Sequence, residues 1–204
     1  MQKFQNMKVL TLDDCEHLTH IPDVSGLSNL KKFTFDFCKN LITIDDSIGH
    51  LNKLELVSAC CCKKLENFPP LWLVSLKNLE LSLHPCVSGM LRFPKHNDKM
   101  YSNVTELCLR ECNLSDECLP IILKWFVNVK HLDLSDNDGF KILPECISEC
   151  HLLRILNLDG CTSLEEIRRI PPNLNYLSAS ECLSLSSSTR RMLLSQVCCG
   201  FFMQ

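Results

Sequence analysis

Apolar and polar residues alternate along this chain in short runs that return at regular intervals. The runs LTLDD at 10–14, FTFDF at 33–37 and LNLDG at 156–160 each place two apolar side chains two positions apart. Alternation of this kind indicates a half-buried β-strand, because successive side chains of a strand point to opposite faces. We therefore expect one strand per run, with its apolar side chains directed into a core. The expected inward pairs are Leu10/Leu12, Phe33/Phe35, Leu79/Leu81, Leu107/Leu109, Leu132/Leu134 and Leu156/Leu158.

The runs belong to an internal repeat that covers most of the chain. Its template is L-x-x-L-x-L-x-x-C-x-x-L-x-x-(I/L/F)-P, and successive units open 21 to 28 residues apart. A period of about 20 to 29 residues with leucines in this spacing is typical of leucine-rich repeats, where each unit gives one strand and a return segment. The units open at Met7, Leu30, Leu54, Leu76, Val104, Val129, Leu153 and Leu174.

The repeat predicts an α/β fold, a leucine-rich-repeat solenoid of about eight units curved like a horseshoe. One unit cannot bury its own apolar face, so stacked units must share a continuous core. A parallel sheet would line the concave face, with irregular or short helical segments on the convex face. We assign residues 1–185 to the array and 186–204 to a C-terminal tail. No polar cap precedes Met7, so we expect an unpaired first strand and a chain that is part of a larger array.

The ninth position of the frame is a cysteine in most units. There the chain leaves the strand and bends inward, which leaves backbone N–H and C=O groups without ladder partners. A buried asparagine or cysteine side chain can form hydrogen bonds with those groups. We therefore predict a structural ladder, in which the side chain at this position of each unit bonds to the backbone of the stack. The fourth unit has His84 at this position, and we expect a small insertion that returns Cys86 to it. The predicted ladder residues are Cys15, Cys38, Cys62, Cys86, Cys112, Asn137, Cys161 and Cys182.

The 15 cysteines also raise the alternatives of metal ligands, disulfides and nucleophiles. None of the candidate zinc clusters has paired C-x-x-C spacing, and ladder thiols on adjacent strands would run parallel instead of meeting. The chain has no phosphate-binding G-x-x-x-x-G-K-[ST] loop, no G-x-S-x-G and no H-E-x-x-H. We expect no metal, no cofactor and no enzymatic activity. The candidate zinc clusters are Cys60-Cys61-Cys62, Cys15-x-His17-x-x-His20 and Cys146-x-x-x-Cys150.

Charge and hydropathy narrow the class of partner and the compartment. The formal net charge is −3 and the basic residues are scattered, which argues against nucleic acid. The longest apolar stretch, at 119–127, contains Lys124 and is too short to span a bilayer. The N-terminus lacks the apolar segment of a secretory signal peptide. We therefore expect a reducing compartment, cytoplasmic or nuclear, and keep an extracellular receptor ectodomain as an alternative.

The connectors between strands resemble those of a known family. The frame, with ITIDDSIGHLNKL at 42–54 and DVSGLSNLKKF at 23–33, resembles the C-terminal leucine-rich repeats of plant intracellular immune receptors. The segment LENFPPLWLVSLKNLELS at 65–82 most resembles the class with a Toll/interleukin-1-receptor-like domain and a nucleotide-binding module before the repeats. The resemblance covers residues 4–185, and SSSTRRMLLSQ at 186–196 is similar to the start of the segment that follows the repeats.

This resemblance implies a role in plant defense signalling. A disease resistance protein of this class recognises a pathogen effector or a guarded host protein, and its repeats restrain the receptor's own nucleotide-binding module. Both would be protein–protein interactions. A generic leucine-rich-repeat adaptor, for example one that selects substrates for a ubiquitin ligase, is the alternative.

Polar side chains between the inward leucines are expected to form a protein-binding concave face. Carboxylates outnumber basic groups there, which favours a basic partner. Phe37 and Cys61 are expected to be exposed apolar groups beside those charges, as in an interface centre. We expect no nucleic acid, membrane or small-molecule substrate at this face. Its predicted residues are Asp13, Asp36, Phe37, Cys61, Glu80, Arg110, Glu111, Asp133, Asp136, Asn157, Asp159 and Glu181.

Overall fold

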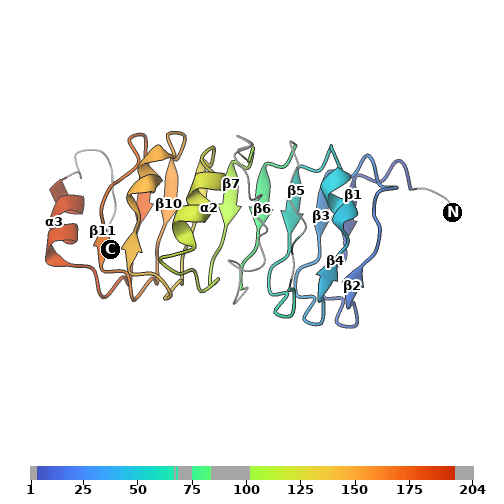
Figure 1. Cartoon of the computed structure of the whole chain (residues 1–204), viewed down its shortest axis with the longest axis horizontal. Coiled ribbons are helices and arrows are strands. Elements are labelled where there is room, and N and C mark those ends of the chain that lie inside the picture. The colour runs from blue at the N-terminus through green and yellow to red at the C-terminus, as the bar shows by residue number, and fades with distance from the viewer. Residues whose placement is uncertain (1–3, 67, 69–74, 84–101, 196–204) are drawn as a thin grey trace.

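A parallel sheet of eight strands runs the length of the molecule in the computed structural model (Figure 1). The structure describes residues 4–66, 68, 75–83 and 102–195. The sheet strands follow one another in chain order, one per repeat, which confirms the predicted solenoid. They are β1 (Val9–Thr11), β3 (Lys32–Thr34), β5 (Leu56–Ser58), β6 (Asn78–Glu80), β7 (Glu106–Cys108), β8 (His131–Asp133), β10 (Ile155–Asn157) and β12 (Tyr176–Ser178).

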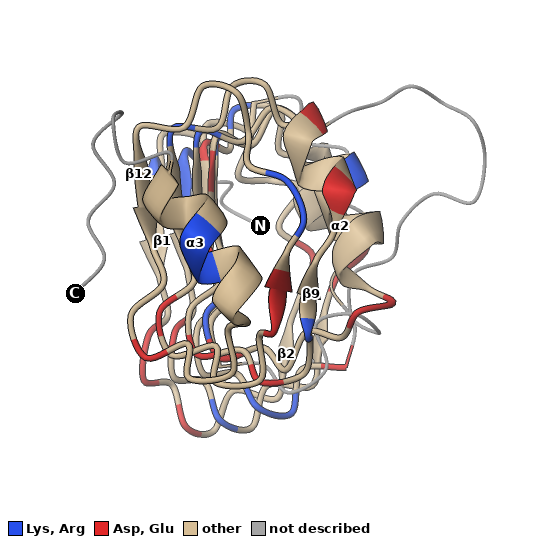
Figure 2. Cartoon of the chain, turned by 90° about the vertical axis from the view of Figure 1, so that its left-hand side faces the viewer, with Lys and Arg blue, Asp and Glu red and all other residues tan. Residues whose placement is uncertain are grey.

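Short strands and helices form the return side, opposite the main sheet (Figure 2). Among these return strands, β2 pairs with β4 and β9 pairs with β11, both in parallel. No described helix is long and apolar enough to cross a membrane. The return elements are β2 (His20–Ile21), β4 (Thr43–Ile44), β9 (Ile142–Leu143), β11 (Glu166–Ile167), the 3₁₀ helices η1 (Asp46–His50) and η2 (Glu145–Glu149), and α2 (Leu119–Trp125).

Adjacent strands of the sheet are aligned so that equivalent positions of the sequence repeat lie opposite each other. Leu132 of β8 lies opposite both Leu107 of β7 and Leu156 of β10, so equivalent leucines stack directly. Phe33 and Phe35 are completely buried, and their rings meet edge to face with centroids 5.1 Å apart. Burial of these aligned apolar columns is the main force that holds such a stack together.

The residue just before each ladder position leaves the strand in the left-handed conformation. Its φ lies between 53° and 69° in all eight turns, although only one of these residues is glycine. Outside glycine this conformation costs about 1–2 kcal/mol per residue, and stacking must offset it. We call these the turn positions: Asp14, Phe37, Cys61, Leu83, Glu111, Asp136, Gly160 and Glu181.

Helix α3 (Ser187–Ser195) lies across the C-terminal end of the stack (Figure 2). Its Thr189 and Leu193 are buried against the core. The hydroxyl of Ser186 accepts a hydrogen bond from the backbone N–H of Thr189 and so caps the start of the helix. The first part of the predicted tail is therefore a helix that covers the last repeat.

Candidate protein-binding face

The ladder side chains join each turn of the face to the turn before it. In five turns the sulfur of a cysteine donates to a carbonyl oxygen at the end of the preceding strand. The pairs, Sγ to O, are Cys38–Leu12 at 3.1 Å, Cys62–Phe35 at 3.0 Å, Cys112–Leu81 at 2.7 Å, Cys161–Leu134 at 3.2 Å and Cys182–Leu158 at 3.0 Å.

Two predicted ladder positions differ from these five. The thiol of Cys15, in the first turn, meets no backbone acceptor among the described residues and is only partly buried. Cys86 lies outside the described residues. The fourth turn keeps the regular frame as far as Leu83, whose φ is 63° and whose N–H donates to the carbonyl oxygen of Arg110. The insertion expected to bring Cys86 into the ladder does not begin before that residue.

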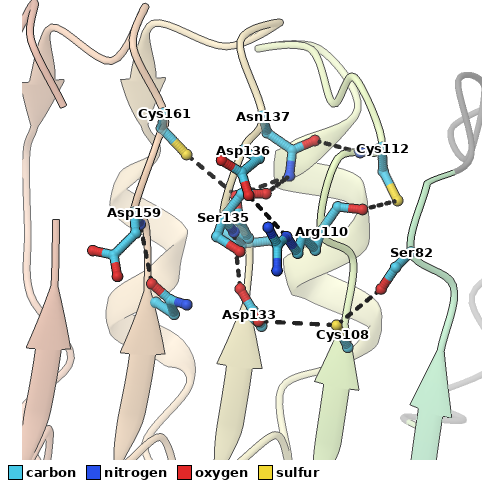
Figure 3. A network of polar contacts seen from close by, with 12 residues as sticks. Ser82, Cys108, Arg110, Cys112, Asp133, Ser135, Asp136, Asn137, Asp159 and Cys161 are labelled. Carbon is cyan, nitrogen blue, oxygen red and sulfur yellow. Dashed lines mark hydrogen bonds and ion pairs between the residues drawn. The ribbon is translucent and has the colours of Figure 1, made fainter. Parts of the chain in front are cut away.

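Asn137 fills the ladder position in the sixth turn and is completely buried (Figure 3). Its Nδ2 donates to the carbonyl oxygens of Leu109 and Leu134, each at 2.8 Å. Its Oδ1 accepts from the backbone N–H groups of Cys112, at 3.0 Å, and Leu114, at 3.1 Å. One amide thus satisfies polar backbone groups of two successive turns.

Burial favours the protonated form of the ladder thiols of Cys38, Cys62, Cys161 and Cys182, because desolvation raises the pKa of each. It raises the pKa of Cys62 and of Cys161 to about 12, and that of Cys182 to about 11. A protonated thiol can donate a hydrogen bond, whereas metal ligation and nucleophilic attack both require the thiolate. All twelve cysteines in the described part of the chain are free thiols. Within the same residues, no three His, Cys, Asp or Glu side chains come together to hold a metal ion.

An open hollow of about 320 Å³ lies on the exposed face of the main sheet, over β6 to β12. Four predicted face residues line it: Glu80, Asp133, Asn157 and Asp159. We call this site the sheet-face hollow. Its complete lining is Glu80, Glu106, Leu107, Cys108, His131, Leu132, Asp133, Ile155, Asn157, Asp159 and Tyr176.

Some predicted face carboxylates also bind the next turn. Asp36 Oδ1 accepts from the Ser58 hydroxyl and from the Cys60 backbone N–H, each at 2.7 Å. Asp159 Oδ1 accepts from the Ser178 hydroxyl at 2.6 Å. These aspartates therefore fix the spacing of adjacent turns as well as contributing negative charge to the face. Asp13 does the same for its neighbour, through the backbone N–H of Asp36 at 2.9 Å.

The turn positions border the face, and one of them is not as expected. Phe37 has 46% of its surface exposed, but Cys61 has only 7% exposed. The expectation that Cys61 is an exposed apolar group was wrong, because its short thiol lies between turns that carry the larger Phe37 and Leu83 at the same position. Arg110 Nε and Asp136 Oδ2 form an exposed ion pair at 2.8 Å (Figure 3). The remaining turn residues of the predicted face, Glu111 and Glu181, are exposed.

Five outward residues of the sheet-face hollow were not foreseen although the same alternation marks them, and one of these is Cys108, at the central face position of β7. Glu106, His131, Ile155 and Tyr176 stand two positions earlier in the frame than the central face residues, and so also point outward. Ile155 and Tyr176 are 38% and 42% exposed. The hollow thus combines carboxylates with exposed apolar groups, which suits a partner that carries both a cation and an apolar side chain.

Comparisons with known proteins agree with the repeat frame. A family model described as "Disease resistance protein RPS4B-like, leucine-rich repeats" matches residues 4–190. Disease resistance protein RPS4B of Arabidopsis thaliana is 28% identical over 182 residues, which is 89% of this chain and 14% of that protein. TMV resistance protein N of Nicotiana glutinosa is 30% identical over 156 residues, 64% of this chain and 13% of that protein. The chain spans about a seventh of the length of these relatives.

A solved structure shares the architecture. The leucine-rich repeat domain of the type III effector XopL superimposes with a TM-score of 0.68 and covers 96% of this chain and 75% of its own. Only 19% of the aligned residues are identical, so this likeness shows the fold alone.

Proposed function

Because the chain belongs to the leucine-rich-repeat family of RPS4B-like disease resistance proteins, we propose that it is the protein-recognition module of a plant immune receptor. In this proposal it acts in the cytoplasm or nucleus and catalyses no reaction. It senses a pathogen effector or a guarded host protein, and it restrains the nucleotide-binding module of its parent receptor in defense signalling.

The observation that carries the proposal is the composition of the sheet-face hollow. Its carboxylates Glu80, Glu106 and Asp133 lie on β6, β7 and β8, beside exposed Ile155 and Tyr176 on β10 and β12. Aromatic and aliphatic groups supply contact area, whereas the charges set orientation and partner choice. A protein surface with lysine or arginine beside an apolar side chain fits this lining.

Charge-neutral variants test the placement of the contact. The triple variant Glu80→Gln, Glu106→Gln, Asp133→Asn and the wild-type chain are each immobilised and incubated with extracts of infected and uninfected leaf. We expect the variant to retain about tenfold less partner than the wild type does. We also expect the amount that the wild type retains to fall as the salt concentration rises. Glu149→Gln on η2 is a control for position, because it removes a carboxylate on the opposite side of the molecule.

Restraint of the switch is tested separately. The chain is co-expressed in leaves with the nucleotide-binding module of a related receptor, and co-precipitation and cell death are scored. We expect binding and reduced cell death, whereas an adaptor unrelated to the switch would change neither. In the leaf-extract experiment, equal recovery of the partner by the triple variant and the wild type would show that the partner does not bind at the sheet-face hollow.

A further inference from the structure

Basic residues that are scattered along the sequence gather at one rim of the main sheet. In every turn after the first, the residue just before the strand donates its backbone N–H to the carbonyl oxygen of the equivalent residue in the preceding turn, at 2.7 to 2.9 Å. These bonds align eight residues in one row, beside the starts of the strand arrows in Figure 1. We call this row the entry rim: Lys8, Lys31, Glu55, Lys77, Thr105, Lys130, Arg154 and Asn175.

The entry rim carries positive charge that the protein leaves largely unpaired. Five of its eight residues are lysine or arginine, all five are exposed, and one residue is a carboxylate. Lys31 and Glu55 form an ion pair at 2.9 Å. Within the described part of the chain, Lys77 and Lys130 take part in no ion pair. These two cations are therefore available to a partner.

The opposite rim of the sheet carries the opposite charge. There the turn positions and the residues just before them include one basic residue, Arg110, which is already paired with Asp136. The two rims are five residues apart along each strand, roughly 16 Å. The exposed face is thus electrically bipolar, although the chain has a formal net charge of −3. The carboxylates of the exit side are Asp13, Asp14, Asp36, Glu111, Asp136, Asp159 and Glu181.

We propose that the entry rim binds an acidic segment of a second protein, which lies across the strands along the row of cations. Adjacent rim residues are separated by the spacing of parallel strands, roughly 4.8 Å, so Lys130 and Arg154 lie side by side and Lys77 lies two strands away. Cations placed at several points along one line match a segment with several carboxylates. Glu55 interrupts the row, so a continuous polyphosphate backbone fits less well than a segment whose charges are spaced along a peptide.

The site lies within the array and apart from the sheet-face hollow. Lys77, Lys130 and Arg154 precede β6, β8 and β10, each of which has a paired strand on both sides. No entry-rim residue lines the hollow. The inference therefore goes beyond the proposed function, and it assigns the face a second partner surface of opposite charge.

A peptide titration tests the entry rim. A fluorescein-labelled peptide of alternating glutamate and alanine, about 12 residues long so that it spans the row when extended, is titrated with the chain and followed by fluorescence anisotropy. The pair Lys77→Glu with Lys130→Glu should weaken binding about tenfold or more, and the neutral pair Lys77→Gln with Lys130→Gln by a smaller factor. Wild-type affinity should fall as the salt concentration rises. Circular dichroism spectra should be unchanged, because both side chains are exposed.

Two lysines outside the rim give the matched control. Lys63→Glu with Lys124→Glu makes the same change in net charge at exposed positions after the third strand and on α2. This pair should leave peptide affinity within about twofold of the wild type, because salt screens charges that are distant from the bound peptide. The triple variant of the hollow should bind the acidic peptide at least as well as the wild type, so failure of the rim site and failure of the hollow site are distinguishable.

Four results would overturn the proposal. The first two are absence of peptide binding by the wild type, and equal weakening in the rim pair and the control pair, which would mean that net charge alone attracts the peptide. An RNA oligonucleotide of equal charge that binds more tightly through the same lysines would assign the rim to nucleic acid. A dimer detected by light scattering and abolished in the rim pair would assign it to a second copy of this chain.

Discussion

Asn137 donates a hydrogen bond from Nδ2 to the carbonyl oxygen of Leu109 at 2.8 Å, where five other turns use a cysteine sulfur for the equivalent carbonyl. The amide is also a good hydrogen-bond acceptor, whereas a thiol is a weak one, and its oxygen accepts from two backbone N–H groups. We therefore expect the Asn137 amide to contribute more to the free energy of unfolding than a ladder thiol does.

Removal of the Asn137 side chain should be the most damaging change in the ladder. Asn137→Ala removes the oxygen that accepts from the buried N–H groups of Cys112 and Leu114 and the amide that donates to the carbonyl oxygen of Leu109, so we expect the free energy of unfolding to fall by about 3–5 kcal/mol. Asn137→Cys should cost less, because a thiol can still donate to Leu109. Urea unfolding at equilibrium measures both, and a reversed order would contradict the assigned hydrogen bonds.

Substitution of a ladder cysteine by alanine should lower the free energy of unfolding more than the same substitution on the return side. Cys161→Ala removes a completely buried thiol and its bond to Leu134, which should cost about 1–2 kcal/mol. Cys146→Ala makes the same chemical change in η2 at a partly exposed site and should stay within about 0.5 kcal/mol. Equal losses in the two variants would contradict the contribution assigned to the buried thiol of Cys161 and its hydrogen bond.

The repeat period was enough to place the strands and six of the eight ladder residues, because a stacked solenoid reuses one frame in every turn. The sequence did not reveal which turn residues have positive φ, since seven of the eight are not glycine. It also did not reveal the sheet-face hollow, which is formed by side chains from five strands. Its shape depends on how far Glu106 or Tyr176 extends over neighbouring turns, and a one-dimensional pattern does not contain that distance.

Gly160 is the turn position where a side chain is least tolerated. Its φ is 69°, and an added Cβ would lie 2.2 Å from Oδ1 of Asp136. Gly160→Ala must therefore both accept a strained backbone and displace that carboxylate, which should cost about 1–3 kcal/mol. Gly26→Ala is the control, because its added Cβ meets no atom within 4 Å. A thermal unfolding midpoint lowered equally in both variants would argue against the close approach.

Alkaline pH should destabilise the protein through its ladder thiols. Burial raises the pKa of Cys62 and of Cys161 to about 12, whereas an unfolded thiol titrates near about 8.5. Above about pH 8.5 the unfolded chain releases thiol protons that the folded chain retains, so the free energy of unfolding falls as pH rises from about 8.5 toward about 12. Below about pH 8 these thiols are protonated in both states and contribute no pH dependence.

The measurement is the urea midpoint at a series of pH values from about 7 to about 10, for the wild type and for Cys62→Ala with Cys161→Ala. Lysine and tyrosine titration affects both proteins alike, so the difference between their slopes isolates the two thiols. We expect the wild type to lose stability more steeply above about pH 8.5 than the double variant. Parallel slopes would mean that these thiols have the same pKa in the folded and unfolded chains, and the burial assigned to the ladder would then be wrong.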